Sequence, residues 1–181
     1  MKSYILNSEL LNGVALARGL TNLNFRLRNV YVWDTDEKRY YMATNGHIMF
    51  VATSELKSYD IRIEKPLALL YKGTVKARKR EDATLHIDDE GKAEFITLRE
   101  NKEVSLVNCE PPEHWKDCIP PENSPKLEVY CCFNPDYLGR IRKFIGSYLF
   151  TRPQTTNNDG RSPVVWFAGN KIAVIMPIKV D

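Results

Sequence analysis

Four cysteines and three histidines are the side chains of this sequence best suited to metal or nucleophilic chemistry. They are Cys109, Cys118, Cys131, Cys132, His47, His86 and His114. No two cysteines have the C-x-x-C spacing of a zinc site, and the histidines lack the H-E-x-x-H spacing of a metalloprotease. Cys131 and Cys132 are adjacent, so they would point to opposite faces of a strand. The spacing predicts reduced thiols, with no metal and no cofactor.

Catalytic and phosphate-binding motifs are also missing from the sequence. It has no G-x-S-x-G nucleophile turn, no P-loop and no G-x-G-x-x-G turn. His47 stands beside a predicted turn with neither a nucleophile nor an orienting group predicted next to it. We therefore expect a protein that is not an enzyme.

Composition indicates an ordinary globular protein. The 181 residues are 43% hydrophobic and 27% charged. No apolar run reaches the roughly 18 residues of a membrane span, and the N-terminal stretch already carries Glu9, so neither a span nor a signal peptide is expected. The predicted location is cytoplasmic. The net charge of +3 permits a polyanionic partner, and the basic segment 76–80 is either a solvated loop or a phosphate-contact patch.

Three stretches of roughly 60 residues share a similar order of signals, which predicts repeated units. Units 1–60 and 61–120 form one predicted domain, 1–120, and residues 121–181 form a third, half-domain unit. The expected order in each unit is one strand, one helix and then three strands, repeated nearly three times along the chain. The predicted helices are 9–20, capped by Ser8; 66–73, opening at Pro66; and 135–146, capped by Asn134.

Apolar and alternating runs between polar turns predict the strands. They are 3–6, 25–33, 38–44, 47–53, 61–65, 83–88, 93–100, 103–109, 127–133, 163–168 and 171–180. Asn45-Gly46 is a two-residue hairpin signal. The proline-rich segment 110–125 is expected to be a linker or a strap, because proline cannot join a central strand. Short helices followed by hairpin-joined strands predict an α+β fold with antiparallel sheets.

Four segments, in order along the chain, resemble bacterial DNA sliding clamps, the beta subunit of DNA polymerase III. The segment "VWDTDEKRYYMATNGHIMFVA" is similar to the family stretch that reads ATDGHRLA. "NCEPPEHWKDCIPP" resembles the family strap FPDYRRVIP, and "LEVYCCFNPDYLGRIRKF" resembles the helix entry IGFNxxYLLDAL. The end of the chain, "KIAVIMPIKVD", resembles a VMPMRL-like run.

The resemblance implies a DNA-clamp, or processivity, fold of repeated strand–helix–three-strand units. Residues 1–120 resemble the middle domain of such a clamp, and 126–181 the second half of its third domain. It implies a replication accessory factor that holds double-stranded DNA without reading its sequence. Its partners would be DNA polymerase or other proteins with clamp-binding motifs, and a homo-oligomer is a further expectation from the resemblance. The small size suggests a phage or mobile element.

The family uses its ATDGHRL and VMPMR segments as two walls of one hydrophobic pocket for partner peptides. The matching residues here are Leu27, Thr44, Gly46, His47, Met49, Pro120, Val174, Met176 and Pro177. Asn45 replaces the family aspartate, and Ile48 replaces its arginine, which removes a polar lip. The simpler alternative is that Asn45-Gly46 forms only a hairpin and that its apolar neighbours fill a core.

The resemblance also points to cations that would touch DNA phosphates. They are Arg18, Arg26, Arg28, Lys72, Arg140, Arg142 and Lys143. Each could equally be an ordinary solvated residue. Three functions remain open at this point: a clamp-like processivity factor, a non-encircling clamp mimic that binds host replication proteins, and a small enzyme or nucleic-acid-binding domain of another fold.

Overall fold

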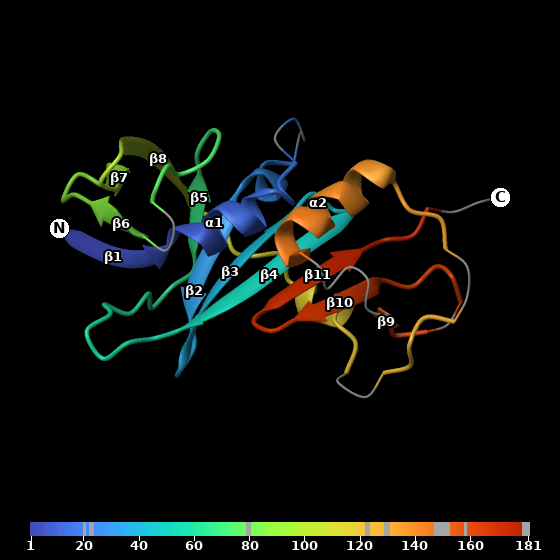
Figure 1. The fold of residues 1–181 in the computed structure, drawn as a ribbon. Coiled ribbons are helices and arrows are strands. Elements are labelled where there is room, and N and C mark those ends of the chain that lie inside the picture. The colour runs from blue at the N-terminus through green and yellow to red at the C-terminus, as the bar shows by residue number, and fades with distance from the viewer. Residues whose placement is uncertain are drawn as a thin grey trace.

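The described part of the chain forms one continuous sheet of eleven strands in the order β1-β6-β7-β8-β5-β2-β3-β4-β11-β10-β9 (Figure 1). The structure, a computed structural model, describes residues 1–19, 21, 24–78, 81–121, 124–128, 131–146, 153–157 and 159–178. Neighbouring strands pair antiparallel at each step. With two α-helices packed on the sheet, the predicted α+β antiparallel fold is confirmed.

The elements of the first predicted unit are β1 (Lys2–Asn7), α1 (Ser8–Ala15), the 3-10 helix η1 (Phe25–Arg28), β2 (Val30–Asp34), β3 (Lys38–Thr44) and β4 (Ile48–Glu55). The second has β5 (Leu67–Leu70), β6 (Asp82–Ile87), β7 (Ala93–Ile96), β8 (Asn101–Val107) and the 3-10 helix η2 (Trp115–Cys118). The third has α2 (Pro135–Ile145), β9 (Gln154–Thr155), β10 (Val164–Ala168) and β11 (Lys171–Ile175).

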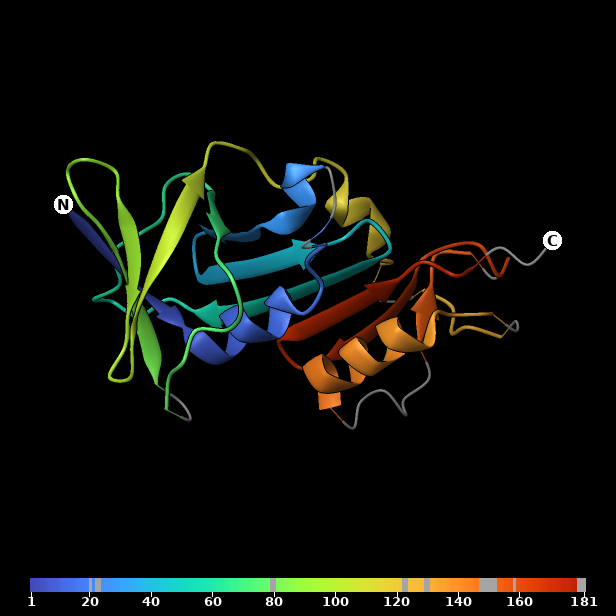
Figure 2. The same ribbon diagram turned by 90° about the horizontal axis from the view of Figure 1, so that it is seen from above.

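Both α-helices lie on one face of the sheet, which we call the inner face (Figure 2). Each buries one apolar side against the strands, with Leu11 and Val14 on α1 and Ile141 and Phe144 on α2. The Phe144 ring stacks on Phe50 of β4 with centroids 4.5 Å apart. The helices therefore fix β4 and β11 from the same side.

The helix caps are only partly as predicted. Asn134 caps α2, since its side chain accepts a hydrogen bond from the amide of Asp136 at 2.9 Å. The cap of α1 is Asn7 rather than Ser8: the Asn7 side chain accepts from the Leu10 amide, while Ser8 is buried and donates to the Glu81 carbonyl. An asparagine side chain can satisfy an unpaired amide of the first turn as well as serine can.

The predicted helix 66–73 is wrong, because Leu67–Leu70 forms strand β5. A short apolar run fits a buried strand as well as a helix, and tertiary pairing decides between them. Here β5 lies between β2 and β8, where Leu69 pairs with Val30 on one side and Leu106 on the other. In the described residues the second unit therefore has no α-helix.

Three predicted strands also differ in the structure. Residues 25–28 form η1, where the Asn24 side chain accepts from the Arg26 amide, and the strand begins only at Val30. Segment 61–65 joins no strand; its Ile61 carbonyl and Ile63 amide bond the buried side chains of Arg39 and Asp34 instead. In the described part of 127–133, Cys132 makes only an isolated bridge to Ile178.

The opposite, outer face of the sheet is covered by residues 108–121, which we call the strap (Figure 2). Trp115, Cys118 and Ile119 of the strap pack on a second apolar cluster that includes Met42 and Val51. The proline-rich segment is thus a strap, as one of the two predicted alternatives had it. No helix in the described residues is long and apolar enough to cross a membrane.

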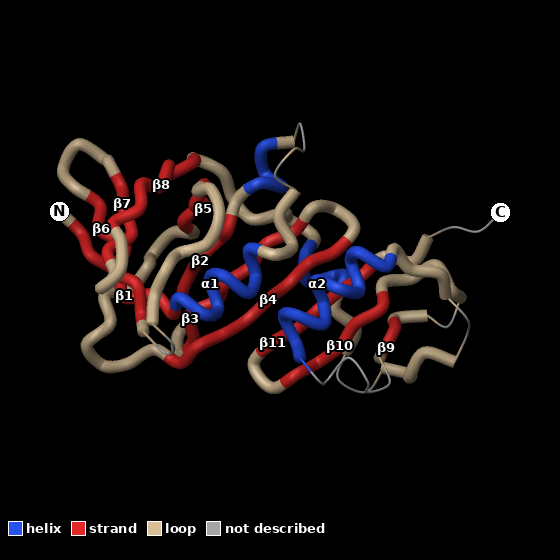
Figure 3. The backbone as a smooth tube through the Cα atoms, turned by 45° about the horizontal axis from the view of Figure 1, so that its top comes forward, coloured by secondary structure: helices blue, strands red, loops and turns tan. Residues whose placement is uncertain are grey.

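Strand β11 pairs with β4 and so joins the first and third predicted units (Figure 3). Ile48 lies opposite Ile175, and Met49 lies opposite Val174. The sheet thus crosses the predicted boundary at residue 120, and the division into domains remains a prediction.

Candidate functional site: a groove beside the β3–β4 hairpin and a basic cleft

The turn between β3 and β4 is held mainly by side chains. The Asn45 side-chain oxygen accepts hydrogen bonds from the amides of His47 and Ile48, both at 2.9 Å. The Thr44 hydroxyl donates to the Ile48 carbonyl and accepts from the Gly46 amide. Gly46 has a φ of 90°, which favours glycine. The bend falls on Gly46 and His47, one residue later than the predicted Asn45-Gly46 turn.

The two predicted pocket walls are in contact. Beyond the Met49–Val174 pair, the Met176 amide donates to the His47 carbonyl at 2.9 Å. Met176 is 37% exposed, and its neighbour Pro177 is half-buried. Hydrogen bonding between the two segments therefore extends one step beyond the β4–β11 pairing, from the turn to the residue that follows β11.

A groove of about 370 Å³ opens on the outer face at this junction, and we call it the hairpin groove. Its lining includes seven of the nine predicted pocket residues: Leu27, Thr44, Gly46, His47, Met49, Val174 and Met176. Pro120 is buried, and neither Pro120 nor Pro177 lines the groove. The volume lies within the usual range of small-ligand pockets, about 300–1,000 Å³.

The remaining lining of the hairpin groove was not predicted as pocket. It comes from Ile48, from η1 and the residue before it, and from the strap: Asn24, Arg26, Ile48, Pro112, Glu113, His114, Trp115 and Cys118. Burial raises the pKa of the Cys118 thiol, so it lines the groove as a neutral group. The proline-rich composition indicated a strap but gave no sign of which of its side chains would face the groove.

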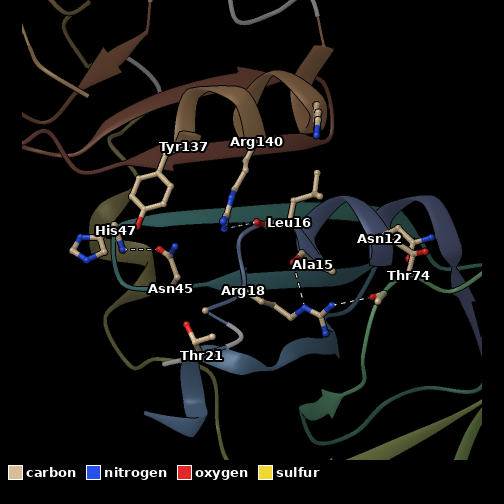
Figure 4. Close-up of a pocket in the computed structure, with 13 residues that line it drawn as sticks. Asn12, Ala15, Leu16, Arg18, Thr21, Asn45, His47, Thr74, Tyr137 and Arg140 are labelled. Atoms are coloured by element: carbon tan, nitrogen blue, oxygen red, sulfur yellow. Dashed lines mark hydrogen bonds between the residues drawn. The ribbon is translucent and has the colours of Figure 1, made fainter. Parts of the chain in front are cut away.

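A second cavity, of about 730 Å³, lies on the inner face between α1, α2 and the loop after β5, and we call it the basic cleft (Figure 4). Arg18, Arg140 and Lys143 line it, together with Asn45 and His47, and no acidic residue does. The His47 ring stacks on Tyr137 of α2 with centroids 6.0 Å apart. The turn at Asn45–His47 thus borders both the basic cleft and the hairpin groove.

The fold matches solved bacterial clamps. The DNA polymerase sliding clamp of Pseudomonas aeruginosa superposes with a TM-score of 0.69 at 12% identity, over 98% of this chain and 67% of that one. The chain has the sliding-clamp fold. The DNA polymerase III beta subunit of Thermotoga maritima gives 0.61 at 13% identity, over 99% of this chain and 66% of that one. The beta sliding clamp of Caulobacter crescentus gives 0.69 at 13% identity, over the same 99% and 66%.

The likeness to sliding clamps is structural. Neither a family model nor a curated protein matches the sequence. This chain spans about two thirds of the length of the clamps that it matches, 66–67% in the three cases above. The comparison establishes the fold, and the functional roles of individual residues rest on the geometry of this chain.

The seven cations predicted to contact DNA lie in different surroundings within the sliding-clamp fold. Arg140 is half-buried in the basic cleft and donates to the Leu16 carbonyl at 3.3 Å (Figure 4). Arg142 and Lys143 are exposed on α2. Lys72 is exposed on the loop after β5. Arg26 and Arg28 lie on η1, and Arg26 lines the hairpin groove rather than the basic cleft.

Arg18 borders the basic cleft but is only 5% exposed. Its guanidinium donates to the carbonyls of Ala15, Tyr71 and Gly73 at 2.7–3.2 Å and stacks on the Tyr71 ring. Burial lowers the pKa of Arg18, and burial also raises the pKa of Tyr71 to about 12. Arg18 is thus engaged in joining α1 to the end of β5, and we leave it out of the surface proposed below.

The described residues hold no group of three or more histidine, cysteine, aspartate or glutamate side chains placed to bind a metal ion. All four cysteines are free thiols. The two cavities therefore offer an apolar groove and a cationic cleft, which are features of binding sites.

Proposed function

We propose that this chain is a sliding-clamp-like accessory protein of DNA replication that holds partner proteins through the hairpin groove. The observation that carries the proposal is the meeting of the β3–β4 turn with β11, 125 residues later at Met49 and Val174, beside an open groove. A turn that served only to reverse the chain would give no reason to expect a groove formed together with a distant segment.

The lining of the hairpin groove suits a short apolar peptide. Leu27, Met49, Val174 and Met176 supply the apolar surface, and the flexible thioethers of methionine adapt to varied ligands. Ile48 stands where clamps carry an arginine, and its buried side chain adds no charge. We therefore expect a preference for leucine and phenylalanine, with less dependence on acidic groups at this point.

The first prediction concerns capture of a peptide that contains glutamine, leucine and phenylalanine. Met176→Asp should weaken binding at least tenfold, because the peptide would have to desolvate a carboxylate inside the groove. Fluorescence anisotropy with a labelled peptide measures this. Ile96→Asp is the matched control, since Ile96 is also 37% exposed but lies on β7, away from the groove.

Both variants should retain the far-ultraviolet circular dichroism spectrum and the unfolding midpoint of the parent protein to within a few degrees. Equal peptide affinity for Met176→Asp and the parent protein would overturn the groove assignment. So would an equal loss with Ile96→Asp.

We also propose that the inner face contacts DNA phosphates. The basic cleft presents Arg140 and Lys143 of α2 with no acidic side chain among its described lining residues, and phosphate contacts carry no sequence information. Each neutralised phosphate adds about 0.9 to the slope of affinity against salt on logarithmic axes.

The second prediction is that reversing two exposed charges of α2, Arg142→Glu with Lys143→Glu, weakens binding to duplex DNA and lowers the salt slope by about two. Lys92→Glu with Arg99→Glu is the charge-matched control, since both residues are exposed in turns outside the cleft. Titrations at several salt concentrations with two unrelated duplexes measure slope and sequence dependence. An equal effect of the two double variants would contradict a specific inner-face contact.

A non-encircling clamp mimic is the second candidate, and the helix-free second unit favours it. The described residues place only two α-helices on the inner face, from the first and third units. Such a protein would bind peptides through the hairpin groove without binding duplex DNA. Peptide binding with no salt-dependent DNA binding would therefore select the mimic.

A further inference from the structure

A second groove lies on the outer face, next to the hairpin groove and bordered by the same strap residue, Trp115. We call it the outer groove. It has a volume of about 410 Å³ and is lined by residues of β3, β4, β10, β11 and the strap. Tyr40, Trp115, Phe167 and Ile172 supply its apolar surface, and Phe167 is 37% exposed. The function proposed above does not use this groove.

The two grooves lie above one row of side chains, which the strap covers at Val51. Met49, Val51 and Thr53 alternate along β4, so all three face the outer side, and Val174 and Ile172 do the same on β11. Met49 lies in the hairpin groove, while Val51 and Thr53 line the outer groove. Four residues of strand span about 13 Å, which four residues of an extended peptide also span. Trp115 lines both grooves, and we call its position, where one groove meets the other, the crossing point.

The outer groove is positively charged. Lys38 and Lys116 are exposed at its rim, and none of its lining residues is acidic. The Lys116 ammonium lies 5.6 Å from the Trp115 ring centroid, above the crossing point. Glu55 lies opposite Lys38 in the strand register, outside the lining, and partly offsets that charge. An occupant that offers carboxylates and an aromatic or aliphatic side chain complements this surface.

We propose that partner peptides anchored in the hairpin groove continue over Trp115 into the outer groove, where acidic residues about four positions from the apolar anchor meet Lys38 and Lys116. The inference rests on the peptide-binding function proposed above and names the kind of partner sequence. Aromatic side chains among lysines also fit single-stranded nucleic acid. Trp115 lines both grooves, so a chain anchored in the hairpin groove meets the outer groove across this ring, which favours a peptide.

The test compares three labelled peptides. One carries the apolar anchor alone, one adds a four-residue spacer with two aspartates and a phenylalanine, and one adds the same spacer with two lysines. Two rim ion pairs should improve affinity for the acidic peptide about five- to tenfold over the anchor alone, and more over the lysine peptide. Raised salt should reduce the gain.

Lys38→Glu with Lys116→Glu should remove the gain and leave the affinity of the anchor peptide unchanged. Glu55→Gln should increase the gain. The same gain in the parent protein and in the double variant would overturn the inference, as would no gain in either. Tight binding of a single-stranded oligonucleotide that competes with the acidic extension but not with the anchor would assign the outer groove to nucleic acid instead. If the parent protein does not bind the anchor peptide at all, that result contradicts the proposed function rather than the inference about the outer groove.

Discussion

At the scale of single residues, the ion pair of Arg39 and Asp34 shows how buried side chains replace a strand. Both side chains are almost fully buried, and two guanidinium nitrogens meet the carboxylate at 2.8 and 2.9 Å. Arg39 also donates to the carbonyls of Ile5 and Ile61, and Asp34 accepts from the Ile63 amide. The pair thus provides hydrogen-bond partners for two backbone groups of segment 61–65, for which the strand prediction is wrong.

Arg39→Met should lower the free energy of unfolding by about 3–5 kcal/mol, because it leaves the Asp34 carboxylate buried without a charged partner. Denaturant unfolding measures the loss. Arg62→Met is the control: Arg62 is exposed and bonds only loop carbonyls, so we expect less than about 1 kcal/mol. Replacing both partners, with Asp34→Leu added to Arg39→Met, should cost less than Arg39→Met alone. A larger loss in the double variant would contradict a penalty from the unpaired charge.

At the scale of elements, the close approach of α1 and α2 depends on Gly13. A Cβ atom at this position would lie 3.1 and 3.3 Å from two ring atoms of Phe144, which is already stacked on Phe50. The helix pair that borders the basic cleft therefore leaves no room for a larger side chain on this side of α1.

Gly13→Val should destabilise the protein by about 1–3 kcal/mol, because it forces Phe144 out of its packed position. Gly139→Ala in α2 is the matched control. A Cβ there meets nothing within 4 Å, so the gain in helix propensity should stabilise the protein by up to about 1 kcal/mol. Thermal unfolding of both variants compares them. Similar shifts for the two would show that the helix contact does not constrain position 13.

Sequence patterns predicted the elements whose signals are local. Asn134 and Pro135 marked the start of α2, and hairpin turns separated the strands of the first unit. The pattern failed for β5, because pairing with strands far along the chain determines the conformation of its four apolar residues. It also failed for η1, where the Asn24 side chain bonds the backbone locally and competes with strand pairing.

The groove was predictable only through the resemblance. Local pattern alone placed a turn at Asn45-Gly46 and gave no reason to connect it to Val174 or Met176. The strap residue Trp115 could not be assigned to the groove, because the path of an irregular segment over a sheet depends on which apolar cluster it covers.

At the scale of the whole molecule, the number of chains decides whether the fold can surround DNA. The chain covers about two thirds of each matched clamp, and its described residues place two α-helices on the inner face. If the protein surrounds DNA as a closed ring, we expect more than one copy of the chain to form that ring.

We expect the protein to assemble, with a mass in solution that is a multiple of the monomer mass and that falls on dilution. Light scattering after size-exclusion chromatography, at several concentrations, measures it. A strict monomer at all concentrations would rule out a self-assembled ring and would leave the non-encircling mimic.

The pairing of β4 with β11 also sets the order of events during synthesis. Residues 48–55 leave the ribosome well before residues 171–175, so β4 must wait as an unpaired edge for more than one hundred residues of elongation. At about 5–20 residues per second this interval lasts several seconds or more, during which the apolar row of β4 has only β3 beside it. If the hairpin groove binds partner peptides as proposed, the complete groove forms only after β11 has paired with β4, and we expect recruitment only by chains in which this pairing is made.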